Sequence, residues 1–243
     1  MARFFMAGAN IKGGTAIIRG RDAEHVRVLR LRPGEDVVIC DGEGTDYKCR
    51  LVYADREQAE AEVLEVVPCP AEPTVRTTLL CGLPKGDRVD YIIQKGVEAG
   101  AYEILFFNCE RCVARPENPE KKLERWQRIA EEAAKQSGRG IIPQVGWAGD
   151  FAQALDAAVK KDLGLFMYET GEREALNAVL EENKNVSTAA IITGPEGGFA
   201  EFEAKLAKVC GLHVCSMGER ILRCETAPIV ALTALMYATG NLA

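Results

Sequence analysis

Two glycine-containing stretches near the C-terminus carry the residues best suited to hold a polar ligand. The first is residues 194–199 (GPEGGF), and the second is residues 217–227 (MGERILRCETA). Each follows a short apolar run and precedes a helical pattern. In an α/β protein, that order places a loop at the carboxyl edge of the sheet, where ligands bind. The sequence therefore predicts one composite pocket built from both stretches.

The first stretch suits recognition by the backbone. It is not followed by Gly-Lys-Ser/Thr, as a Walker A loop would be, and it lacks the glycine spacing of the dinucleotide fingerprint. Its three glycines let the backbone approach a ligand closely and take positive φ. Free N–H and C=O groups there could read the edge of an adenine or bind a carboxylate. Glu196 could face the ligand or serve as a helix-dipole partner, the role we expect of Glu201 and Glu203.

The second stretch is richer in side chains that could contact a ligand. After a glycine turn it holds charged residues around an apolar pair, namely Gly218, Arg220, Ile221, Leu222, Arg223 and Glu225. The apolar pair could pack on a flat ring, and a helix that begins near Glu225 offers free N–H groups. Arg223 could hold a phosphate or polarise a base. The alternative is a structural ion pair with Glu225 or Glu219, but proximity to the glycine loop favours a functional role.

The nine cysteines include one close pair, Cys109 and Cys112. An odd count in a chain without an export signal indicates reduced thiols. A zinc site would need a second close pair, and the only histidines are His25 and His213. A redox pair would need a helix N-terminus directly afterwards, where residues 115–119 predict a loop. We therefore expect two small, half-buried residues at a strand end, and no metal site.

Composition and charge limit the class of protein. Hydrophobic residues make up 47% of the chain, no apolar run is long enough to cross a bilayer, and the N-terminus lacks a signal sequence, so we expect a cytoplasmic protein. The net charge is −6, yet residues 1–32 carry seven Lys or Arg against two acidic residues. This cluster fits a phosphate-binding face or an ordinary solvated surface, and charge alone does not separate the two.

A proline-rich break at residues 68–73 divides the chain into predicted domains 1–70 and 74–243. The first has β-rich runs at 15–18, 36–40, 47–53 and 59–67, a hairpin turn at 41–44, and one short helix over 25–31. In the second, strand patterns at 78–83, 104–107, 163–168, 189–193 and 212–217 alternate with helical patterns at 87–99, 119–137, 150–160, 172–183, 199–210 and 225–239. The alternation predicts an α/β fold with a parallel sheet covered on both faces.

The last predicted helix is apolar nearly all round over residues 227–237. A helix without a polar face must be buried on every side. It is either the central core helix or a helix covered by a partner subunit, and the small size of the chain slightly favours the subunit interface. Pro228 falls in the first turn, where proline is tolerated.

Together the two stretches resemble the RsmE family, bacterial enzymes of the SPOUT superfamily that methylate N3 of a uridine in 16S ribosomal RNA. Other stretches agree with this family in order, namely residues 3–5 (RFF), 25–30 (HVRVLR), 83–87 (LPKGD), 94–100 (QKGVEAG), 110–112 (ERC) and 132–139 (EAAKQSGR). The resemblance covers nearly the whole chain. Cys224 and Ala99 depart from the residues common in the family, and Cys224 could make the pocket sensitive to thiol reagents.

The resemblance implies a PUA-like RNA-binding β-barrel followed by a SPOUT domain with a C-terminal trefoil knot, an exception to the rule against threaded chains. It implies a homodimer joined through the C-terminal helix, with no membrane association. The cofactor implied is S-adenosylmethionine, and the residues that would bind it are Tyr168, Glu169, Thr193, Gly194, Pro195, Glu196, Gly197, Gly198, Met217, Gly218, Arg220, Ile221, Leu222, Thr226 and Ala227.

The implied reaction assigns further roles. Arg223 is the first candidate to stabilise charge on the uracil, with Arg3 or Arg139 as alternatives, and Glu225 or Glu196 could accept the N3 proton. The partner would be 16S rRNA or the 30S subunit, docked by Arg19, Arg21, Arg27, Arg30, Arg32, Lys85, Lys95, Arg111 and Arg139. Competing interpretations are a related enzyme for another RNA base, a non-catalytic RNA-binding factor and, more remotely, an NAD enzyme.

Overall fold

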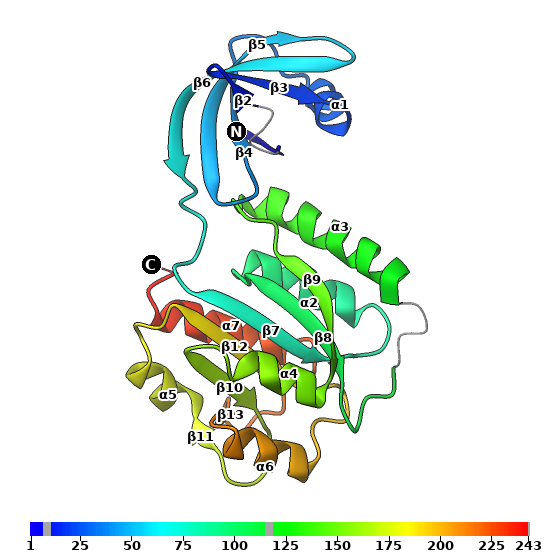
Figure 1. The fold of residues 1–243 in the computed structure, drawn as a ribbon, viewed down its shortest axis with the longest axis vertical. Coiled ribbons are helices and arrows are strands. Elements are labelled where there is room, and N and C mark those ends of the chain that lie inside the picture. The colour runs from blue at the N-terminus through cyan, green and yellow to red at the C-terminus, as the bar shows by residue number, and fades with distance from the viewer. Residues whose placement is uncertain (7–10, 115–118, 243) are drawn as a thin grey trace. The chain divides into compact units, whose positions relative to one another are not determined.

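The computed structural model describes residues 1–6, 11–114 and 119–242, and the chain forms two compact units (Figure 1). The first unit comprises Met1–Glu72 together with Ala134–Ile142. The second comprises Pro73–Ala133 together with Pro143–Ala243. Residues 134–142 thus join the unit formed by the start of the chain.

A six-stranded sheet and one helix, α1 (Arg21–Val28), form the first unit. In spatial order the strands are β1 (Ala2–Phe5), β4 (Asp36–Cys40), β5 (Thr45–Ala54), β6 (Gln58–Pro68), β3 (Thr15–Arg19) and β2 (Ile11–Lys12). The β1–β4 pair is parallel and the other pairs are antiparallel. The sheet curls around a core that includes Phe4, Ile18 and Leu51. Two register shifts between β5 and β6 help these long strands to bend.

The predicted hairpin at residues 41–44 joins β4 to β5, and its glycines Gly42 and Gly44 take positive φ. The helix predicted over 25–31 is instead α1, which begins at Arg21 and ends at Val28. Asp22 and Glu24 occupy its first turn, where acidic side chains complement the helix dipole. Arg30 takes φ of 56°, a left-handed conformation that ends the helix.

The end of the proline-rich segment is fixed within the first unit by one carboxylate. The Glu72 side chain accepts hydrogen bonds from Arg139 Nε (2.9 Å) and Nη2 (2.8 Å). It also accepts the backbone N–H groups of Gly140 (2.6 Å) and Ile141 (3.0 Å). The Arg139 side chain is only 3% exposed. This buried pair therefore attaches residues 139–141 to the segment that follows β6.

A seven-stranded sheet forms the centre of the second unit, and every pair in it is parallel. In spatial order the strands are β11 (Glu174–Ala175), β13 (His213–Ser216), β10 (Leu163–Met167), β12 (Thr188–Thr193), β7 (Arg76–Gly82), β8 (Glu103–Asn108) and β9 (Gln144–Asp150). The predicted parallel sheet is confirmed, whereas β9 and β11 were not anticipated. The helices are α2 (Arg88–Glu98), α3 (Pro119–Ser137), α4 (Phe151–Ala158), α5 (Leu176–Glu182), α6 (Glu201–Val209) and α7 (Ala227–Ala238).

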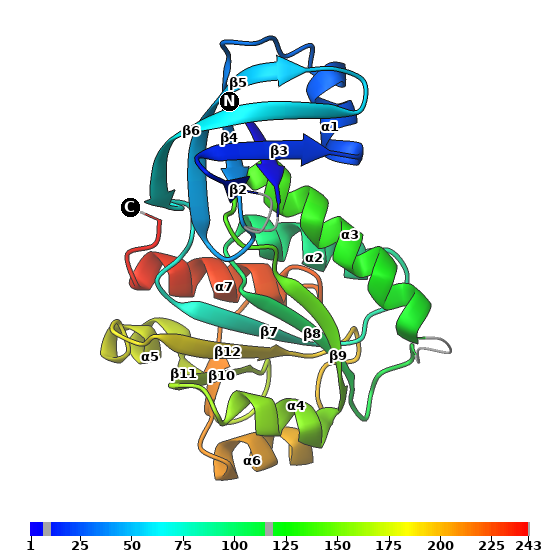
Figure 2. The same ribbon diagram turned by 45° about the horizontal axis from the view of Figure 1, so that its top comes forward.

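Helices cover both faces of this sheet, with α4 and α6 on one side and α2 and α7 on the other (Figure 2). The layer under α4 and α6 is a continuous core that contains Phe107, Phe151, Phe166 and Phe199. The rings of Phe166 and Phe199 lie 4.4 Å apart between centroids. Aromatic pairs of this kind stabilise the fold beyond what the burial of apolar area contributes. Phe199, which lies just before α6, therefore holds the start of that helix against the sheet.

The last helix, α7, is both a core helix and a partly exposed one. It packs against β7, β12 and α2, and its buried residues are Pro228, Ala231, Leu232, Leu235 and Met236. On its other side, Val230 and Tyr237 are 40% and 77% exposed. In the single chain α7 is therefore buried on one side only, and not on every side as expected. No helix in the described part of the chain is long and apolar enough to cross a membrane.

A second buried ion pair stabilises the first unit. Arg3 donates from Nη1 and Nη2 to the two carboxylate oxygens of Asp46 at 2.6 Å and 2.7 Å. Both side chains are largely buried. Bidentate pairs of this kind are strong and directional, but removal of one partner leaves an uncompensated charge in the interior.

We expect Asp46→Ala to lower the free energy of opening of β1, β4 and β5 by about 3 kcal/mol, because the buried Arg3 charge loses its partner. Native-state hydrogen exchange of these strands measures that free energy. The control is Glu65→Ala, which removes the exposed Lys48–Glu65 pair and should cost less than about 1 kcal/mol. Equal losses in the two variants would contradict the importance of the buried pair.

Candidate functional site

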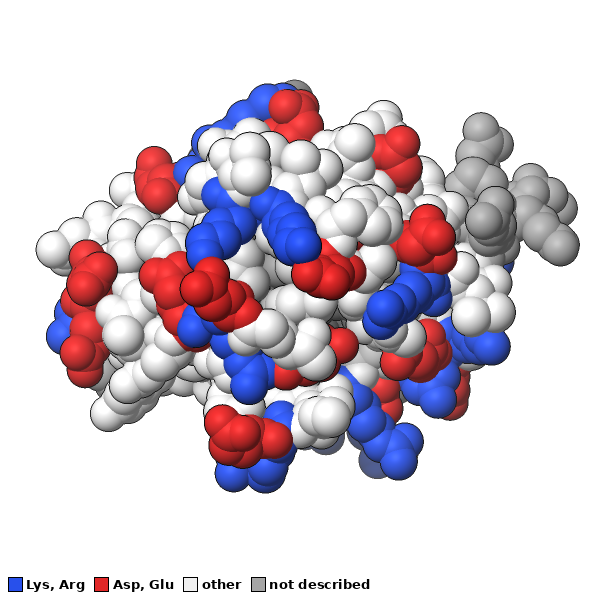
Figure 3. All heavy atoms as spheres, turned by 90° about the horizontal axis from the view of Figure 1, so that it is seen from below, with Lys and Arg blue, Asp and Glu red and all other residues white. Residues whose placement is uncertain are grey.

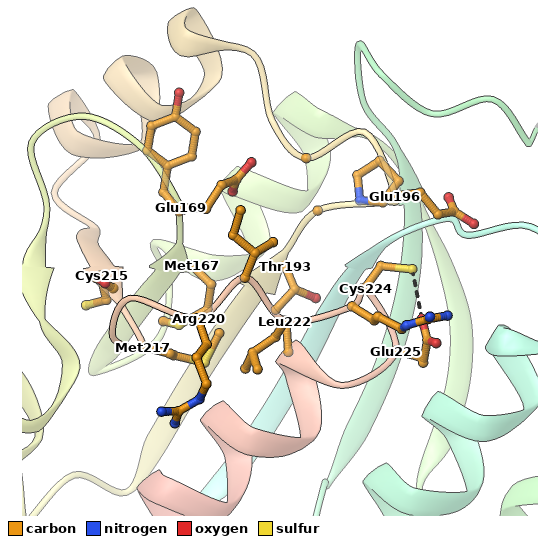
Figure 4. Close-up of a pocket in the computed structure, with 18 of the residues that line it drawn as sticks. Met167, Glu169, Thr193, Glu196, Cys215, Met217, Arg220, Leu222, Cys224 and Glu225 are labelled. Atoms are coloured by element: carbon orange, nitrogen blue, oxygen red, sulfur yellow. Dashed lines mark hydrogen bonds between the residues drawn. The ribbon is translucent and has the colours of Figure 1, made fainter.

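A cavity of about 340 Å³ lies at the carboxyl ends of β10, β12 and β13. These three strands are neighbours in the sheet, in the order β13-β10-β12. The loops that follow them therefore meet at one place, and Figure 4 shows their side chains converging there. The lining residues are Arg88, Met167, Tyr168, Glu169, Thr193, Gly194, Pro195, Glu196, Gly198, Cys215, Ser216, Met217, Gly218, Arg220, Ile221, Leu222, Arg223, Cys224, Glu225 and Ala227.

The glycine loop after β12 is tightly folded. The Gly198 N–H donates to the Pro195 carbonyl at 2.9 Å, and Gly198 takes φ of 64°. A side chain at 198 would be strained and would collide with the Glu169 carboxylate. A Cβ at 194 would lie 3.1 Å from the Gly198 carbonyl carbon. The positive φ therefore favours glycine at 198, the close approach of the Gly198 backbone favours glycine at 194, and the cavity wall here carries no side chains.

The loop after β13 is built from two turns. Ser216 Oγ accepts the Gly218 N–H at 3.2 Å, and Gly218 itself takes φ of 94°. Farther on, the Arg223 carbonyl accepts the N–H groups of Thr226 and Ala227, both at 2.9 Å, and this turn leads into α7. Between the turns, Leu222 contributes an apolar surface to the cavity, and Ile221 is 84% exposed.

Arg88, the first residue of α2, connects the two loops, and sequence reasoning missed it. Its Nη1 donates to Glu196 Oε1 at 2.8 Å, and its Nε lies 3.5 Å from Glu225 Oε2. Glu196 also accepts the Lys85 N–H at 2.9 Å. Glu196 therefore lines the cavity and is at the same time the ion-pair partner of Arg88. Arg88 directly follows the LPKGD stretch at residues 83–87, which comes after β7, a further strand of the sheet. That position after a strand was the signal that the sequence offered for Arg88.

Arg223 is one of two unengaged cations among the described residues of the cavity, the other being Arg220. Its side chain is exposed, and within the part of the chain that the structure describes its guanidinium makes no ion pair. The predicted alternative, a structural pair with Glu225 or Glu219, is not formed. Glu225 instead faces Arg88 and accepts a hydrogen bond from the Cys224 thiol at 3.3 Å. Arg223 is therefore available to an anionic or polar ligand.

Cys224 is a poor target for thiol reagents. Its side chain is buried, and burial raises the pKa of its thiol to about 12, with a further rise from the hydrogen bond to Glu225. A thiol must ionise before it acts as a nucleophile. The sensitivity considered for this cysteine is therefore not expected at neutral pH, although the residue lines the cavity.

Most predicted cofactor-binding residues line this cavity, as do the proposed catalytic residues Arg223 and Glu225. The exceptions are Gly197 and Thr226, which lie within the same two loops. Gly197 faces Arg111, whose Nη1 donates to the Gly197 carbonyl at 3.1 Å. Glu201 and Glu203 occupy the first turn of α6, as expected of helix-dipole partners.

The remaining predicted basic residues are dispersed. Arg3 and Arg139 belong to the first unit and are engaged by Asp46 and Glu72. Lys95 pairs with Glu98 at 2.8 Å. The exposed candidates are Arg19, Arg27, Arg30, Arg32, Lys85 and Arg111, whereas the side chain of Arg21 lies outside the described residues. Figure 3 shows one face of the molecule, on which basic and acidic side chains are intermixed.

The described side chains contain no group of three or more His, Cys, Asp or Glu able to hold an ion. The pair Cys109 and Cys112 follows β8 directly, and both residues are partly buried, as predicted.

Comparisons with known proteins show the family of this chain. Residues 70–236 match the RNA methyltransferase domain family, and residues 18–64 match the RNA methyltransferase PUA domain family. The ribosomal RNA small subunit methyltransferase E of Bacillus subtilis is 36% identical over 233 residues, which cover 93% of this chain and 91% of the relative.

Solved structures give the same result. A ribosomal RNA small subunit methyltransferase E from Neisseria gonorrhoeae bound to S-adenosylmethionine is 34% identical, with a TM-score of 0.83 over 98% of this chain and 97% of that one. A methyltransferase from Legionella pneumophila in complex with the same cofactor is 27% identical, with a TM-score of 0.82 and 98% of both chains covered. With these motifs, this fold and these relatives, the chain belongs to the ribosomal RNA small subunit methyltransferase E family.

Proposed function

We propose that the protein transfers a methyl group from S-adenosylmethionine to N3 of a uridine in 16S ribosomal RNA. The observation that carries the proposal is the cavity formed by loops after three adjacent parallel strands, with a glycine wall and an unengaged arginine. Relatives of the same family carry the name of a small-subunit rRNA methyltransferase, and two solved neighbours hold this cofactor.

The residues of the cavity fit the proposed cofactor. The glycine wall at 194 and 198 allows a flat base to approach the backbone, whose N–H and C=O groups can pair with its edge. Met167, Met217 and Leu222 supply apolar surface for the ring and the sulfur. The residues proposed to hold the cofactor are Tyr168, Glu169, Thr193, Gly194, Pro195, Glu196, Gly197, Gly198, Met217, Gly218, Arg220, Ile221, Leu222, Thr226 and Ala227.

When bound, the cofactor supplies a methyl group already activated on a sulfonium, so the protein need not provide a nucleophile or a metal. The protein's tasks are to orient the uracil and to manage the weakly acidic N3–H. Loss of that proton places negative charge on O2 and O4, and the Arg223 guanidinium stabilises it as oxyanion donors do. Glu225, two residues away, accepts the proton. Glu196 is less suited because its carboxylate accepts N–H groups of Lys85 and Arg88 at 2.9 Å and 2.8 Å, whereas Glu225 lies 3.5 Å from Arg88 Nε and accepts the weaker hydrogen bond of the Cys224 thiol.

RNA binding is assigned to the first unit and to the rim of the cavity. The target base must leave its stack to reach the site, and exposed cations hold the flanking phosphates. Arg19, Arg27, Arg30 and Arg32 lie on the first unit, and Lys85 and Arg111 on the second. The buried pairs Arg3–Asp46 and Arg139–Glu72 favour structural roles for Arg3 and Arg139. The enzyme would act in the cytoplasm, where small subunits are assembled.

We further assign the second unit to the SPOUT class, with its last segment threaded as a trefoil knot. The sheet order supports this assignment, because β13 lies between β10 and β11, which precede it along the chain. After β13, the chain returns through the cavity loop to α7, which packs against β7 and β12. A polypeptide knotted here would hold the cofactor loops close together without a disulfide.

A homodimer through α7 completes the proposal. Val230 and Tyr237 of this helix are exposed apolar side chains. They border a groove of about 950 Å³ shared with α5, whose wall includes Leu176 and Leu180. Exposed apolar surface of this kind marks interaction sites, and an identical helix from a second copy would bury it around a two-fold axis.

We expect Arg223→Ala to reduce methyl transfer by at least about 100-fold, as loss of an oxyanion donor does, with cofactor affinity within about threefold of wild type because ground-state binding is preserved. The assay follows label from S-adenosylmethionine into small subunits and naked 16S rRNA, and mass spectrometry locates the product. Lys205→Ala, on exposed α6, is the control. Normal turnover by Arg223→Ala would assign Arg223 a structural role, and a product other than N3-methyluridine would overturn the proposed target.

Arg88→Met should raise the KM for S-adenosylmethionine by about tenfold, equivalent to about 1.4 kcal/mol, since Glu196 and Glu225 lose the cation they share. Arg88→Lys should restore part of the affinity. Lysine keeps the positive charge, but it lacks the separate N–H groups that arginine directs to Glu196 and Glu225. Steady-state kinetics with the cofactor varied at saturating RNA gives the values. An unchanged KM in Arg88→Met would mean that the bridge does not position the loops.

Tyr237→Glu should convert the protein to monomers at micromolar concentration, because it places a charge in the proposed apolar interface. Sedimentation velocity measures the distribution. Val159→Glu is a matched control, because Val159 is an exposed apolar residue at the end of α4. A wild-type monomer, or a dimer unaffected by Tyr237→Glu, would argue against this interface.

A further inference from the structure

Cys109 and Cys112 form a close thiol pair beside the proposed cofactor site. Their sulfur atoms lie 3.4 Å apart, and both cysteines are free. The Cys112 N–H donates to the Cys109 carbonyl at 3.1 Å, so residues 109–112 form a tight turn after β8. The sulfurs must approach by little more than an ångström to reach the disulfide bond length of about 2.05 Å. No third ligand for a metal accompanies them among the described residues.

The two residues between the cysteines hold the glycine loop. Arg111 donates from Nη1 to the Gly197 carbonyl at 3.1 Å, and its Cβ lies where a side chain on Gly197 would be. The Glu110 N–H donates to Glu203 Oε1 at 3.1 Å. The buried Glu203 in turn accepts the Ala200 N–H at 2.8 Å through its other oxygen. A change in the turn is therefore transmitted to both ends of residues 197–200.

The two thiols are chemically unequal. The hydrogen bond from Cys109, followed by the N–H groups of Cys109 and Leu83, lowers the pKa of Cys112 below its usual range, although burial opposes the shift. The same hydrogen bond and burial raise the pKa of Cys109. By contrast, burial raises the pKa of Cys81 and Cys215 to about 12. The Cys109 N–H, which donates to the Cys112 sulfur at 3.4 Å, thus favours the thiolate of Cys112 over that of Cys109, as a helix N-terminus favours one thiolate in other redox pairs.

We propose that Cys109 and Cys112 are a redox-active pair whose disulfide displaces the glycine loop and weakens binding of the cofactor. The formation of the disulfide stands on the geometry of the turn alone. Its effect on the cofactor rests on the proposed function.

The oxidant is a small-molecule disulfide. The Cys112 thiolate attacks one of its sulfur atoms, which forms a mixed disulfide and releases one thiolate. Cys109 then loses its proton and attacks the Cys112 sulfur, which releases the second thiolate. The protein loses two electrons and two thiol protons in total, and the small disulfide is reduced to two thiols. A reducing thiol pool reverses both steps.

The first experiment maps the bond. The full-length protein is equilibrated with mixtures of reduced and oxidised glutathione, free thiols are blocked, and peptides are identified by mass spectrometry. We expect a disulfide between Cys109 and Cys112 in oxidising mixtures and its loss on addition of dithiothreitol. Cys109→Ser should instead accumulate the mixed disulfide at Cys112. Failure to detect the internal bond in the wild type, with glutathione attached elsewhere or nowhere, overturns the proposal.

The second experiment measures the consequence by calorimetry with S-adenosylmethionine. Oxidation should weaken binding at least about fivefold, within the usual range of coupling between sites, and dithiothreitol should restore it. Cys109→Ser and Cys112→Ser should each be insensitive to oxidation, whereas Cys210→Ser, which removes an exposed cysteine outside the pair, should respond as the wild type does. Equal affinity of the reduced and oxidised proteins overturns the coupling. No binding by the reduced protein contradicts the proposed function instead, and the peptide map still decides the disulfide.

Discussion

The site depends on the adjacency of three parallel strands. Because β13, β10 and β12 are neighbours and point the same way, their carboxyl ends open onto one edge of the sheet. Loops that are distant in sequence are thereby brought around one cavity. Ligand sites in open α/β sheets form where strand connections diverge in this way. Here the glycine backbone and the apolar side chains of Met167, Met217 and Leu222 form part of the wall, which suits the flat base of a nucleoside.

Charge inside the cavity is distributed so that Arg220 and Arg223 stay available among its described residues. Arg88 contacts both Glu196 and Glu225, and Glu225 is one of the two carboxylates that could have engaged Arg223. The two loops are joined by this bridge, and the Arg223 guanidinium is left exposed at the turn that begins α7. An unengaged donor of this kind can stabilise charge that develops on the substrate without first breaking an ion pair. The positions of Arg88 and Arg223 therefore belong to one electrostatic arrangement.

The sequence predicted the second unit's alternating elements and most of the cavity wall, because strand periodicity and glycine motifs are local signals. Prediction from the sequence failed where contacts between residues distant in the sequence determine the structure. The strand β9 (QVGWAGD) carries two glycines that weaken a strand pattern, yet Gly146 packs closely on β8, where a Cβ would lie 2.7 Å from the Leu105 side chain. Arg139 looked like an RNA contact, but its partner Glu72 lies 67 positions away. No local pattern reveals such a pair, nor the return of residues 134–142 to the first unit.

The most direct test of this account is a crystal structure of the protein soaked with S-adenosylmethionine or its demethylated product. The account predicts density for the compound between residues 194–198 and 217–226, with the base against the glycine backbone. The same loops closed on their own side chains, or the compound bound only elsewhere on the molecule, would contradict it.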